Sequence, residues 1–478
     1  MQSVAADRRV ENLTRRFSRQ RINGCCLFSE SHRESAHTAL RSPPPEARSV
    51  ILRSMSTIIS LLREAPWLEQ SRALAWTRVL ALASALVALA FILCTHGGST
   101  PDPWGRPLAP DFVSFWTAGK LALDGAPESA WNPAVHAAAQ RASFPPDAGY
   151  KTDYYAFFYP PPFLLICLPL ALLPYGGADA LWLLTTGAAY FATIRALLPP
   201  RWPAVLIAMA FPAALMNATH GQNGALSTAL LGTAALQLER RPRLAGVCLG
   251  ALCLKPQLAL LVAPALFAAR RWRSAAWAVV GAATLSLASL LVFHEAAWRG
   301  FISNLPVAQE ALQAGWVGFA KMVSPFAAAR LLGAGLSGAW ITQAVVSCAG
   351  LVILMAVVRC RPEAPAEGAT LAAATCLATP FLLDYDLMLL AVPLAWVAAE
   401  AERGGYLPWE KLILAAAFAL PLVARPIATL AGVPVAPPVL IALLGVVARR
   451  AILAPASLRK PDPVLALPWA SKSMTKAR

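Results

Sequence analysis

The sequence predicts an all-α polytopic membrane protein, a multispanning bundle of roughly 10–13 transmembrane or re-entrant helices with a long first outer loop. Of the 478 residues, 57% are hydrophobic and only 14% are charged, and the mean hydropathy is +0.54. Soluble proteins carry about 25% charged residues. A soluble core does not accommodate this much apolar sequence, whereas a set of membrane helices does.

The formal net charge of +16 does not predict a nucleic-acid partner. In membrane proteins, arginine clusters in short loops set the orientation of the helices, and this explains the basic balance here. The nine cysteines show no CxxC spacing and lie mostly in apolar segments. We interpret them as small packing residues, neither metal ligands nor a disulfide framework.

The ends of the chain differ from its middle. Residues 1–54 hold ten arginines, no lysine and no apolar periodicity, which is typical of a basic disordered tail. The alternative, which we favour, is that translation begins at Met55, because residues 55–62 read as an amphipathic segment of the kind that precedes a first membrane span. No cleavable signal peptide is recognisable. The membrane domain is predicted over residues 55–450, and residues 451–478 form a basic cytoplasmic tail.

The first span is predicted at residues 76–94, after several arginines that keep the N-terminus inside. The loop over residues 95–159 is then outside, and it carries six acids against four bases. Such an acid-containing loop is the expected place for chemistry. Later apolar runs are in part shorter than the ~20 residues of a straight span, so short or broken helices are expected. These runs cover residues 160–175, 178–197, 203–219, 223–238, 244–269, 274–293, 338–358, 369–383, 385–399, 410–424 and 434–448.

Arginine clusters at residues 240–243, 270–273, 359–361 and 449–450 are predicted to lie inside. Counting crossings from these clusters places the turn at 220–224, His294 and residues 384–386 outside. A second outer loop follows at residues 294–337, where aromatic residues among polar ones suit helices lying in the interface plane.

Two runs do not read as simple spans. The run 244–269 has arginine clusters at both ends and Lys255-Pro256 in its middle. We therefore predict a hairpin of two short helices with Lys255 near its tip. The run 160–175 contains five prolines and is predicted to be re-entrant or interfacial; the alternative is that it spans and that Arg195 and Arg201 lie outside.

Five short motifs follow one another at family-like spacing: Asp111, Tyr159-Pro160-Pro161-Pro162, Gly221-Gln222-Asn223, Lys255-Pro256 and Asp384-Tyr385-Asp386. Together they resemble the bacterial polyprenyl-phosphate-dependent mannosyltransferases of glycosyltransferase family 87, within the GT-C fold group. The resemblance covers residues 75–450. The stretch 125–131 departs from the family pattern, in which a tyrosine follows a Gly-Xaa-Pro turn, and leaves the acceptor undetermined.

The resemblance implies a membrane hexosyltransferase, of inverting type, that moves mannose from a polyprenyl-phosphate donor to a lipid or glycan acceptor. The reaction would occur on the outer face of the bacterial inner membrane, among membrane lipids and without a cofactor. It needs a base for the acceptor hydroxyl, and Asp111 is the candidate because a carboxylate takes the proton and stabilises oxocarbenium charge. The alternative is that Asp111 only caps a helix.

Lys255 is the candidate contact for the donor phosphate, because an ammonium inside an apolar run is costly without a partner. The alternative is a structural ion pair, for instance with an acid of the outer loop. Further candidates for donor or substrate binding, each with a structural alternative such as a polar turn, a helix cap or an interfacial position, are Gln222, Asn223, His220, His294, Tyr159, Asp384 and Asp386.

No metal site is predicted, since the pair Asp384 and Asp386 is not sufficient to hold a divalent cation. The sequence contains no P-loop or Rossmann glycine motif, so a nucleotide-driven mechanism is not supported. The rival function is a transporter or flippase for a lipid-linked or amphiphilic solute, which broken helices and an intramembrane lysine also fit. A third reading is a degenerate family member that only binds lipid.

Overall fold

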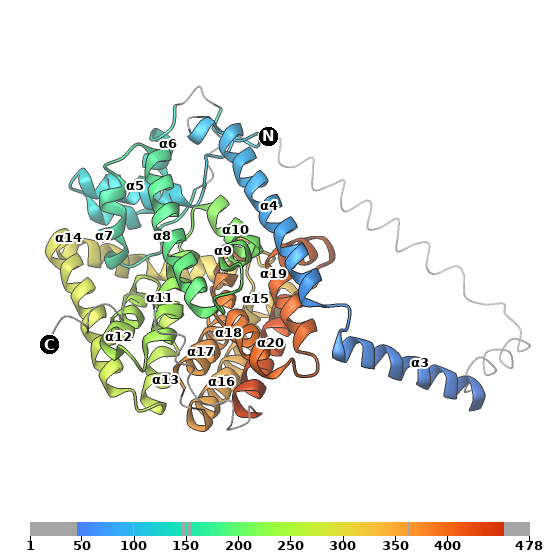
Figure 1. Cartoon of the computed structure of the whole chain (residues 1–478). Helices are drawn as coiled ribbons and strands as arrows, with labels where there is room; N and C mark the ends of the chain where they lie inside the picture. Colours follow the sequence, from blue (N-terminus) through green and yellow to red (C-terminus); the bar gives the residue numbers. More distant parts are fainter. Residues whose placement is uncertain (1–44, 99, 146–148, 151–153, 362, 454–478) are drawn as a thin grey trace, which may run out of the picture. The chain divides into compact units, whose positions relative to one another are not determined.

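The computed structural model describes residues 45–98, 100–145, 149–150, 154–361 and 363–453. Of the tails predicted at 1–54 and 451–478, residues 1–44 and 454–478 lie outside the described residues, and residues 451–453 are the last of helix α20 (Ala436–Leu453). By its contacts the chain divides into two units, 1–61 and 62–478. Helix α3 (Pro45–Glu64) belongs mostly to the first unit, so residues 45–54 are helical (Figure 1). The contacts described below all lie within the second unit.

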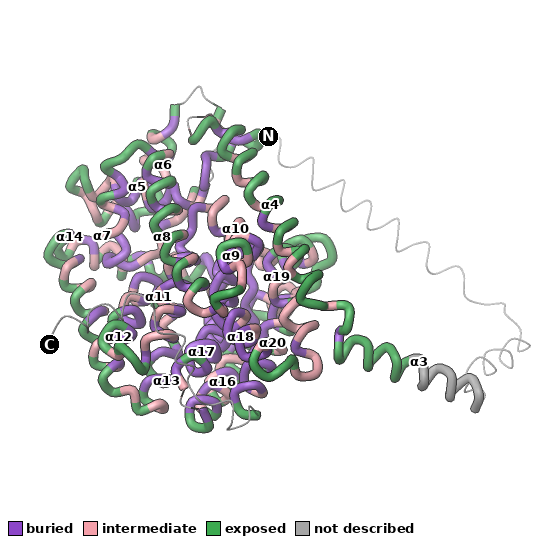
Figure 2. The backbone as a smooth tube through the Cα atoms, viewed as in Figure 1, coloured by how far each residue is buried: buried purple, intermediate pink, exposed green. Residues whose placement is uncertain are grey.

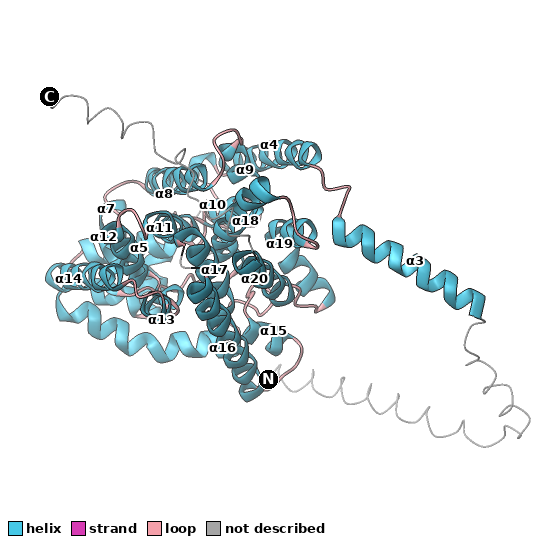
Figure 3. Ribbon diagram, turned by 60° about the horizontal axis from the view of Figure 1, so that its bottom comes forward, coloured by secondary structure: helices cyan, strands magenta, loops and turns pink. Residues whose placement is uncertain are grey.

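Within the described residues the secondary structure consists of eighteen α-helices, α3 to α20, with short 3-10 turns and no named strand (Figure 3). Six of the helices are long and apolar enough to cross a membrane. The prediction of an all-α polytopic membrane protein is thereby confirmed. The six are α4 (Gln70–Cys94), α8 (Tyr175–Leu197), α14 (Trp272–Ala314), α16 (Leu336–Cys360), α19 (Glu410–Ala431) and α20 (Ala436–Leu453).

The longest of these, α14, has 43 residues and is broken at His294, where φ is 58° and ψ is −176°. The break falls where the predicted span 274–293 ends. The first part of the predicted outer loop 294–337 is therefore helical as far as Ala314, and α15 (Pro325–Leu331) follows it.

Many of the remaining helices are short, as expected from the apolar runs. They are α7 (Pro161–Leu170), α9 (Ala204–Ala210), α10 (Pro212–His220), α11 (Gly224–Gln237), α17 (Ala364–Ala378) and α18 (Ala391–Gly404). The run 203–219, predicted as one piece, is interrupted at Phe211 because Pro212 has no amide hydrogen to continue α9 and instead begins α10.

The run 244–269 forms two short helical segments, as predicted. The first consists of α12 (Pro242–Gly250) and η6 (Ala251–Leu254), and the second of η7 (Pro256–Ala259) and α13 (Val262–Ala268). Lys255 lies between them. Arg271, just after the second segment, lies 3.4 Å from Glu239, just before the first. The two ends of the hairpin therefore lie next to each other.

Helices α11, α17, α18 and the turn η8 (Asp384–Leu390) form the centre of the bundle, which Figure 2 shows as largely buried. Small residues allow close contact there: a Cβ added to Gly368 of α17 would lie 2.1 Å from the Cβ of Ala235 on α11. Helix α4 is different, because Ala81 is its one buried residue. It presents an almost wholly exposed apolar surface.

The outer loop predicted at 95–159 contains η3 (His96–Gly98), α5 (Phe112–Leu123), η4 (Pro127–Trp131) and α6 (Pro133–Ala142). Helix α5 packs on α7 through aromatic rings, with Phe115 and Phe163 centroids 4.8 Å apart. The Tyr175 hydroxyl donates to the carbonyl of Ala109 at 2.9 Å. These contacts fix the chain on either side of Asp111.

Candidate functional site

Asp111 stands at the start of α5 without serving as its cap. Its side chain makes no capping hydrogen bond to the first turn, so the alternative explanation from the sequence does not describe its contacts. Instead Oδ2 accepts a hydrogen bond from Nε2 of Gln222 at 3.0 Å. The Asp111 side chain is 14% exposed. A carboxylate held in this way is oriented and still accessible.

The turn between α10 and α11 connects the two halves of the site. Gln222 donates to Asp111 and accepts, through Oε1, from the hydroxyl of Tyr159 at 3.1 Å. The next residue, Asn223, accepts through Oδ1 from Nζ of Lys255 at 3.1 Å. Two neighbouring amides thus hold the carboxylate on one side and the ammonium on the other. The structure brings together Asp111 and Lys255, as the sequence predicted.

Gly221 makes this arrangement possible. Its φ is +67°, in the left-handed region that suits glycine. A Cβ at this position would lie 2.6 Å from Cβ of Phe112 and 2.8 Å from Cβ of Ala109, the residues near Asp111 in α5 and the preceding turn. Because glycine leaves that space free, the end of α10 approaches the start of α5 closely enough for Gln222 to reach Asp111.

Lys255 is buried, with 4% of its surface exposed, and its Nζ lies 2.5 Å from Oδ1 of Asp386. The ion-pair alternative is therefore the arrangement that the structure shows, with an acid of η8 as partner instead of one from the outer loop. Asp386 also accepts from the amide of Leu383 at 3.2 Å. Partnered on both sides, the buried charges of Lys255 and Asp386 are compensated.

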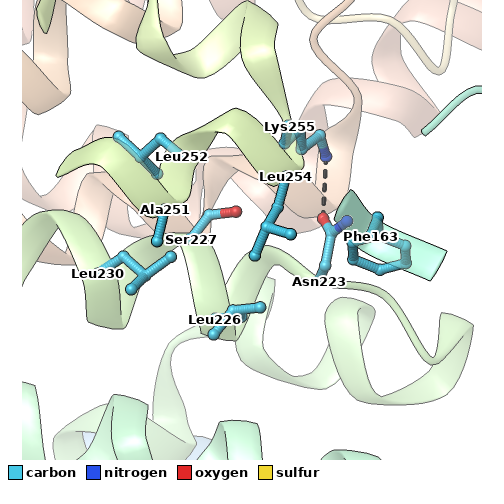
Figure 4. A pocket seen from close by; sticks show the side chains of 9 residues that line it. All are labelled: Phe163, Asn223, Leu226, Ser227, Leu230, Ala251, Leu252, Leu254 and Lys255. Carbon is cyan, nitrogen blue, oxygen red and sulfur yellow. Dashed lines mark hydrogen bonds between the residues drawn. The ribbon is translucent and has the colours of Figure 1, made fainter. Parts of the chain in front are cut away.

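A pocket lies beside Lys255, lined by Phe163, Asn223, Ser227 and Leu254 among others (Figure 4). Figure 4 shows the Lys255 side chain directed towards Asn223 at its edge. The pocket has a volume of about 10 Å³, enough for a single water. A phosphate reaches Lys255 in this arrangement only if the neighbouring side chains move.

Asp111, Tyr159, Gln222, Asn223, Lys255 and Asp386 form a connected group, here called the Asp111 cluster. Lys321 also belongs to it. Its Nζ lies 3.7 Å from Oδ2 of Asp111, and its side chain is 16% exposed. The ring of Tyr385 is close to both lysines, with its centroid 5.3 Å from Nζ of Lys255 and 5.4 Å from Nζ of Lys321. An aromatic face stabilises cations at such distances. The cluster therefore has two ammonium groups near Tyr385, of which that of Lys255 is buried and that of Lys321 is more accessible.

Asp384 and His220 lie at the edge of this cluster. Oδ1 of Asp384 accepts from the amide of Tyr385 at 2.9 Å, and Oδ2 lies 3.6 Å from Nη1 of Arg425 on α19. Burial raises the pKa of Asp384, and the charges of Lys321, His220 and Arg425 oppose that rise. Burial also lowers the pKa of His220, whose Nδ1 is 2.8 Å from the carbonyl of Met216. That contact puts the proton of neutral His220 on Nδ1 and leaves Nε2 as an acceptor.

A model of glycosyltransferase family 87 matches residues 157–380. Over these residues the chain belongs to this glycosyltransferase family. No curated protein and no solved structure matches it significantly. The matched segment includes Tyr159, Gln222, Asn223, Lys255 and Lys321, and it ends just before Asp384-Tyr385-Asp386. Part of the cluster thus lies inside the family's own sequence pattern, whereas Asp111 lies before the matched segment and residues 384–386 and Arg425 lie after it. The chain is a membrane glycosyltransferase.

His294 is the one predicted site residue that this glycosyltransferase does not bring to the cluster. It is exposed at the break in α14, and none of the contacts that join Asp111, Gln222 and Lys255 includes it. Among the described residues, no group of three histidine, cysteine or acidic side chains is arranged to hold a metal ion. Asp384 and Asp386 have their own cationic neighbours, Arg425 and Lys255.

Sequence reasoning missed Lys321 and Arg425. Lys321 reaches the site because residues 321–323 run antiparallel to 382–384: the amide of Asp384 donates to the carbonyl of Lys321 at 3.2 Å, and the amide of Val323 to that of Leu382 at 2.9 Å. One feature of the sequence could have pointed to Lys321, namely the scarcity of lysine. Arginine supplies most of the positive charge in this chain, and Lys255 and Lys321 are the only lysines between residues 152 and 410.

Proposed function

We propose that this glycosyltransferase moves a hexose, mannose, from a polyprenyl-phosphate donor to a lipid or glycan acceptor. The observation that carries the proposal is the Asp111 carboxylate. It makes no capping hydrogen bond to its helix, is partly exposed, and is held by Gln222 beside the ammonium of Lys321. A base and a cation side by side are what transfer from a phosphate-linked sugar requires. The order of sequence motifs that resembles the polyprenyl-phosphate-dependent mannosyltransferases supports the donor class.

In the proposed reaction, Asp111 accepts the proton of the acceptor hydroxyl as its oxygen attacks the anomeric carbon. The bond between that carbon and the phosphate oxygen breaks, and polyprenyl phosphate leaves with the bonding electron pair. Attack opposite the leaving group inverts the anomeric configuration. The carboxylate also stabilises the positive charge that develops at the anomeric centre.

The departing phosphate needs a cation, and three lie around the cluster. Lys321 and Arg425 have accessible side chains, 16% and 47% exposed, whereas Lys255 is held by Asp386 in a nearly closed space. We therefore assign the first phosphate contact to Lys321. Lys255 contributes positive potential from beside the ring of Tyr385 and contacts the phosphate directly only if Asp386 releases it. Gln222, Asn223, Tyr159, His220, Asp384 and Asp386 are proposed to line the donor site.

The proposed orientation places this site on the outer face of the bacterial inner membrane. At the other ends of the helices, arginines form a band of ion pairs: Arg201 with Glu402, Arg361 with Glu400, and Arg450 with Glu410. Arginine-rich ends of membrane helices stay in the cytoplasm. The Asp111 cluster then faces the periplasm or the cell exterior, where a polyprenyl-phosphate donor presents its sugar.

The test uses the full chain, purified and reconstituted in nanodiscs. Polyprenyl-phosphate mannose carrying a labelled sugar is supplied together with a total membrane lipid extract as the source of acceptor, and released polyprenyl phosphate is quantified. GDP-mannose without the lipid donor is the control. We expect release from the lipid donor and none of the label transferred from GDP-mannose. Transfer from GDP-mannose would contradict the donor assignment. A lipid donor that stays intact in nanodiscs and is moved across the bilayer when the protein is placed in sealed proteoliposomes would favour a flippase.

A further inference from the structure

A large cavity lies between α4, α8, α9, α18 and α19, and its charged end is far from the Asp111 cluster. Its volume is about 810 Å³, within the size range of small-molecule sites. Helix α19 shows the separation: Arg425 lies beside Asp384, whereas Lys411 lines the cavity. Fourteen residues of helix separate the two, or about 21 Å at 1.5 Å per residue. The charged end of the cavity is therefore remote from the site described above.

Most of the cavity wall is apolar or aromatic. Helix α4 contributes Leu80, and the opposite wall is formed by Tyr190, Ile207, Phe211 and Phe418. In a membrane-spanning protein, such a wall beside an exposed apolar helix is in contact with lipid chains, not water. Helix α4 packs mainly on α9 and α10 (Figures 1 and 3), so its first half borders a space that the protein itself leaves unfilled.

The charged groups of the cavity come from the arginine-rich end of the helices. Five line it: Glu69, Arg72, Arg201, Glu402 and Lys411. Arg201 forms an ion pair with Glu402. Over the described residues, neither Arg72 nor Lys411 has an acidic group within ion-pair distance. Lys411 is half-buried and lies 5.7 Å from the ring centroid of Tyr406. Two cations without acidic partners therefore border an apolar cavity.

We propose that this cavity binds one anionic phospholipid of the membrane leaflet at the arginine-rich end. Its phosphate lies between Arg72 and Lys411, and an acyl chain runs along Phe211 and Phe418 between α4 and the rest of the bundle. Basic side chains near a membrane surface attract anionic headgroups, and the apolar wall selects a ligand with a chain. The lipid completes the packing of α4, which the protein side chains leave largely exposed.

The experiment measures lipid binding by the full chain in detergent, without any glycosyl donor. Phosphatidylglycerol or phosphatidylcholine is titrated, and retained lipid is counted by native mass spectrometry on the monodisperse fraction. We expect one tightly held phosphatidylglycerol and weaker retention of phosphatidylcholine. The double variant Arg72→Ala/Lys411→Ala is expected to bind phosphatidylglycerol about tenfold more weakly. Arg78→Ala is the matched control, because Arg78 is exposed on the same helix and does not line the cavity.

A second variant tests the cavity without changing charge. Ala398 lines it from α18, and Ala398→Phe fills part of the space that the acyl chain would occupy. We expect this variant to lose the retained lipid while its elution profile stays that of the wild type. Unchanged phosphatidylglycerol binding in both the double variant and Ala398→Phe would overturn the proposal, as would equal retention of the two lipids by the wild type.

Discussion

The ammonium of Lys321 lies 3.7 Å from the carboxylate of Asp111, although the two residues belong to different loops of the chain. The contact depends on the short antiparallel pairing of residues 321–323 with 382–384. That pairing places Lys321 near the ring of Tyr385, where its side chain is 16% exposed, whereas the side chain of Lys255 near the same ring is only 5% exposed. The proposed chemistry follows from this division between an accessible and a buried ammonium.

Lys321→Met is expected to lower kcat/KM for the lipid-linked donor by about 10²-fold, the typical effect of removing one group that stabilises developing charge. Lys321→Arg should recover part of the activity, because the charge is kept. Lys120→Met is the matched control: Lys120 lies on α5 against the ring of Trp116 and has no part in the cluster. Donor turnover measured for the three variants checks this. Equal losses at positions 120 and 321 would contradict the assignment.

The pair Lys255 and Asp386 is predicted to be coupled energetically. Lys255→Met leaves the Asp386 carboxylate buried without its cation, which typically costs about 3–5 kcal/mol. Asp386→Leu should destabilise the protein for the same reason. The double variant should be more stable than either single one, because neither charge is then left alone. Thermal unfolding of all four proteins in one detergent measures the coupling; additive losses would show that the two side chains do not form a pair in solution.

Activity separates two roles for Lys255. If Lys255 acts only through the ion pair, the double variant Lys255→Met/Asp386→Leu should regain donor turnover together with stability. If Lys255 also contributes positive potential to the phosphate, the double variant recovers its melting temperature but its turnover stays below that of Asp386→Leu, which lacks the same carboxylate and keeps Lys255. We expect the second result, with an unchanged KM for the acceptor.

The sequence predicted the fold and part of the site for identifiable physical reasons. Arginine clusters at both ends of 244–269 predicted the hairpin around Lys255, because a single span would place one cluster on the wrong side. The break at Phe211 was missed because both sides of it are equally apolar, so hydropathy does not change there. The role of Asp386 as the partner of Lys255, and the position of Lys321, depend on contacts between distant segments, which no local pattern encodes.

The outer loop is expected to lose stability as the pH falls below about 6.5. His136 of α6 is fully buried, with Nε2 3.2 Å from the carbonyl of Ser114 and Nδ1 3.4 Å from the amide of Gln140. Burial lowers the pKa of His136 to about 4. The unfolded chain therefore binds a proton that the folded chain does not, and by pH 4 the protonation costs ~3 kcal/mol of stability.

Melting temperatures measured between pH 7.5 and pH 4.5 test this. The wild type should lose more stability over that range than His136→Gln, which has no group to protonate. His294→Asn serves as the control, since His294 is exposed and its replacement should leave the slope of the wild type unchanged. Parallel pH profiles for the wild type and His136→Gln would contradict the assignment of a buried neutral histidine.

The most direct test of the account is donor turnover by Asp111→Asn compared with Asp124→Asn in the same preparation of nanodiscs. Both replacements keep the size of the side chain, and Asp124 is exposed at the other end of α5. General-base catalysis contributes about 10²–10⁴-fold, so Asp111→Asn should lose release of polyprenyl phosphate by that factor and keep the wild-type melting temperature, while Asp124→Asn stays active. Wild-type turnover by Asp111→Asn would contradict the central claim.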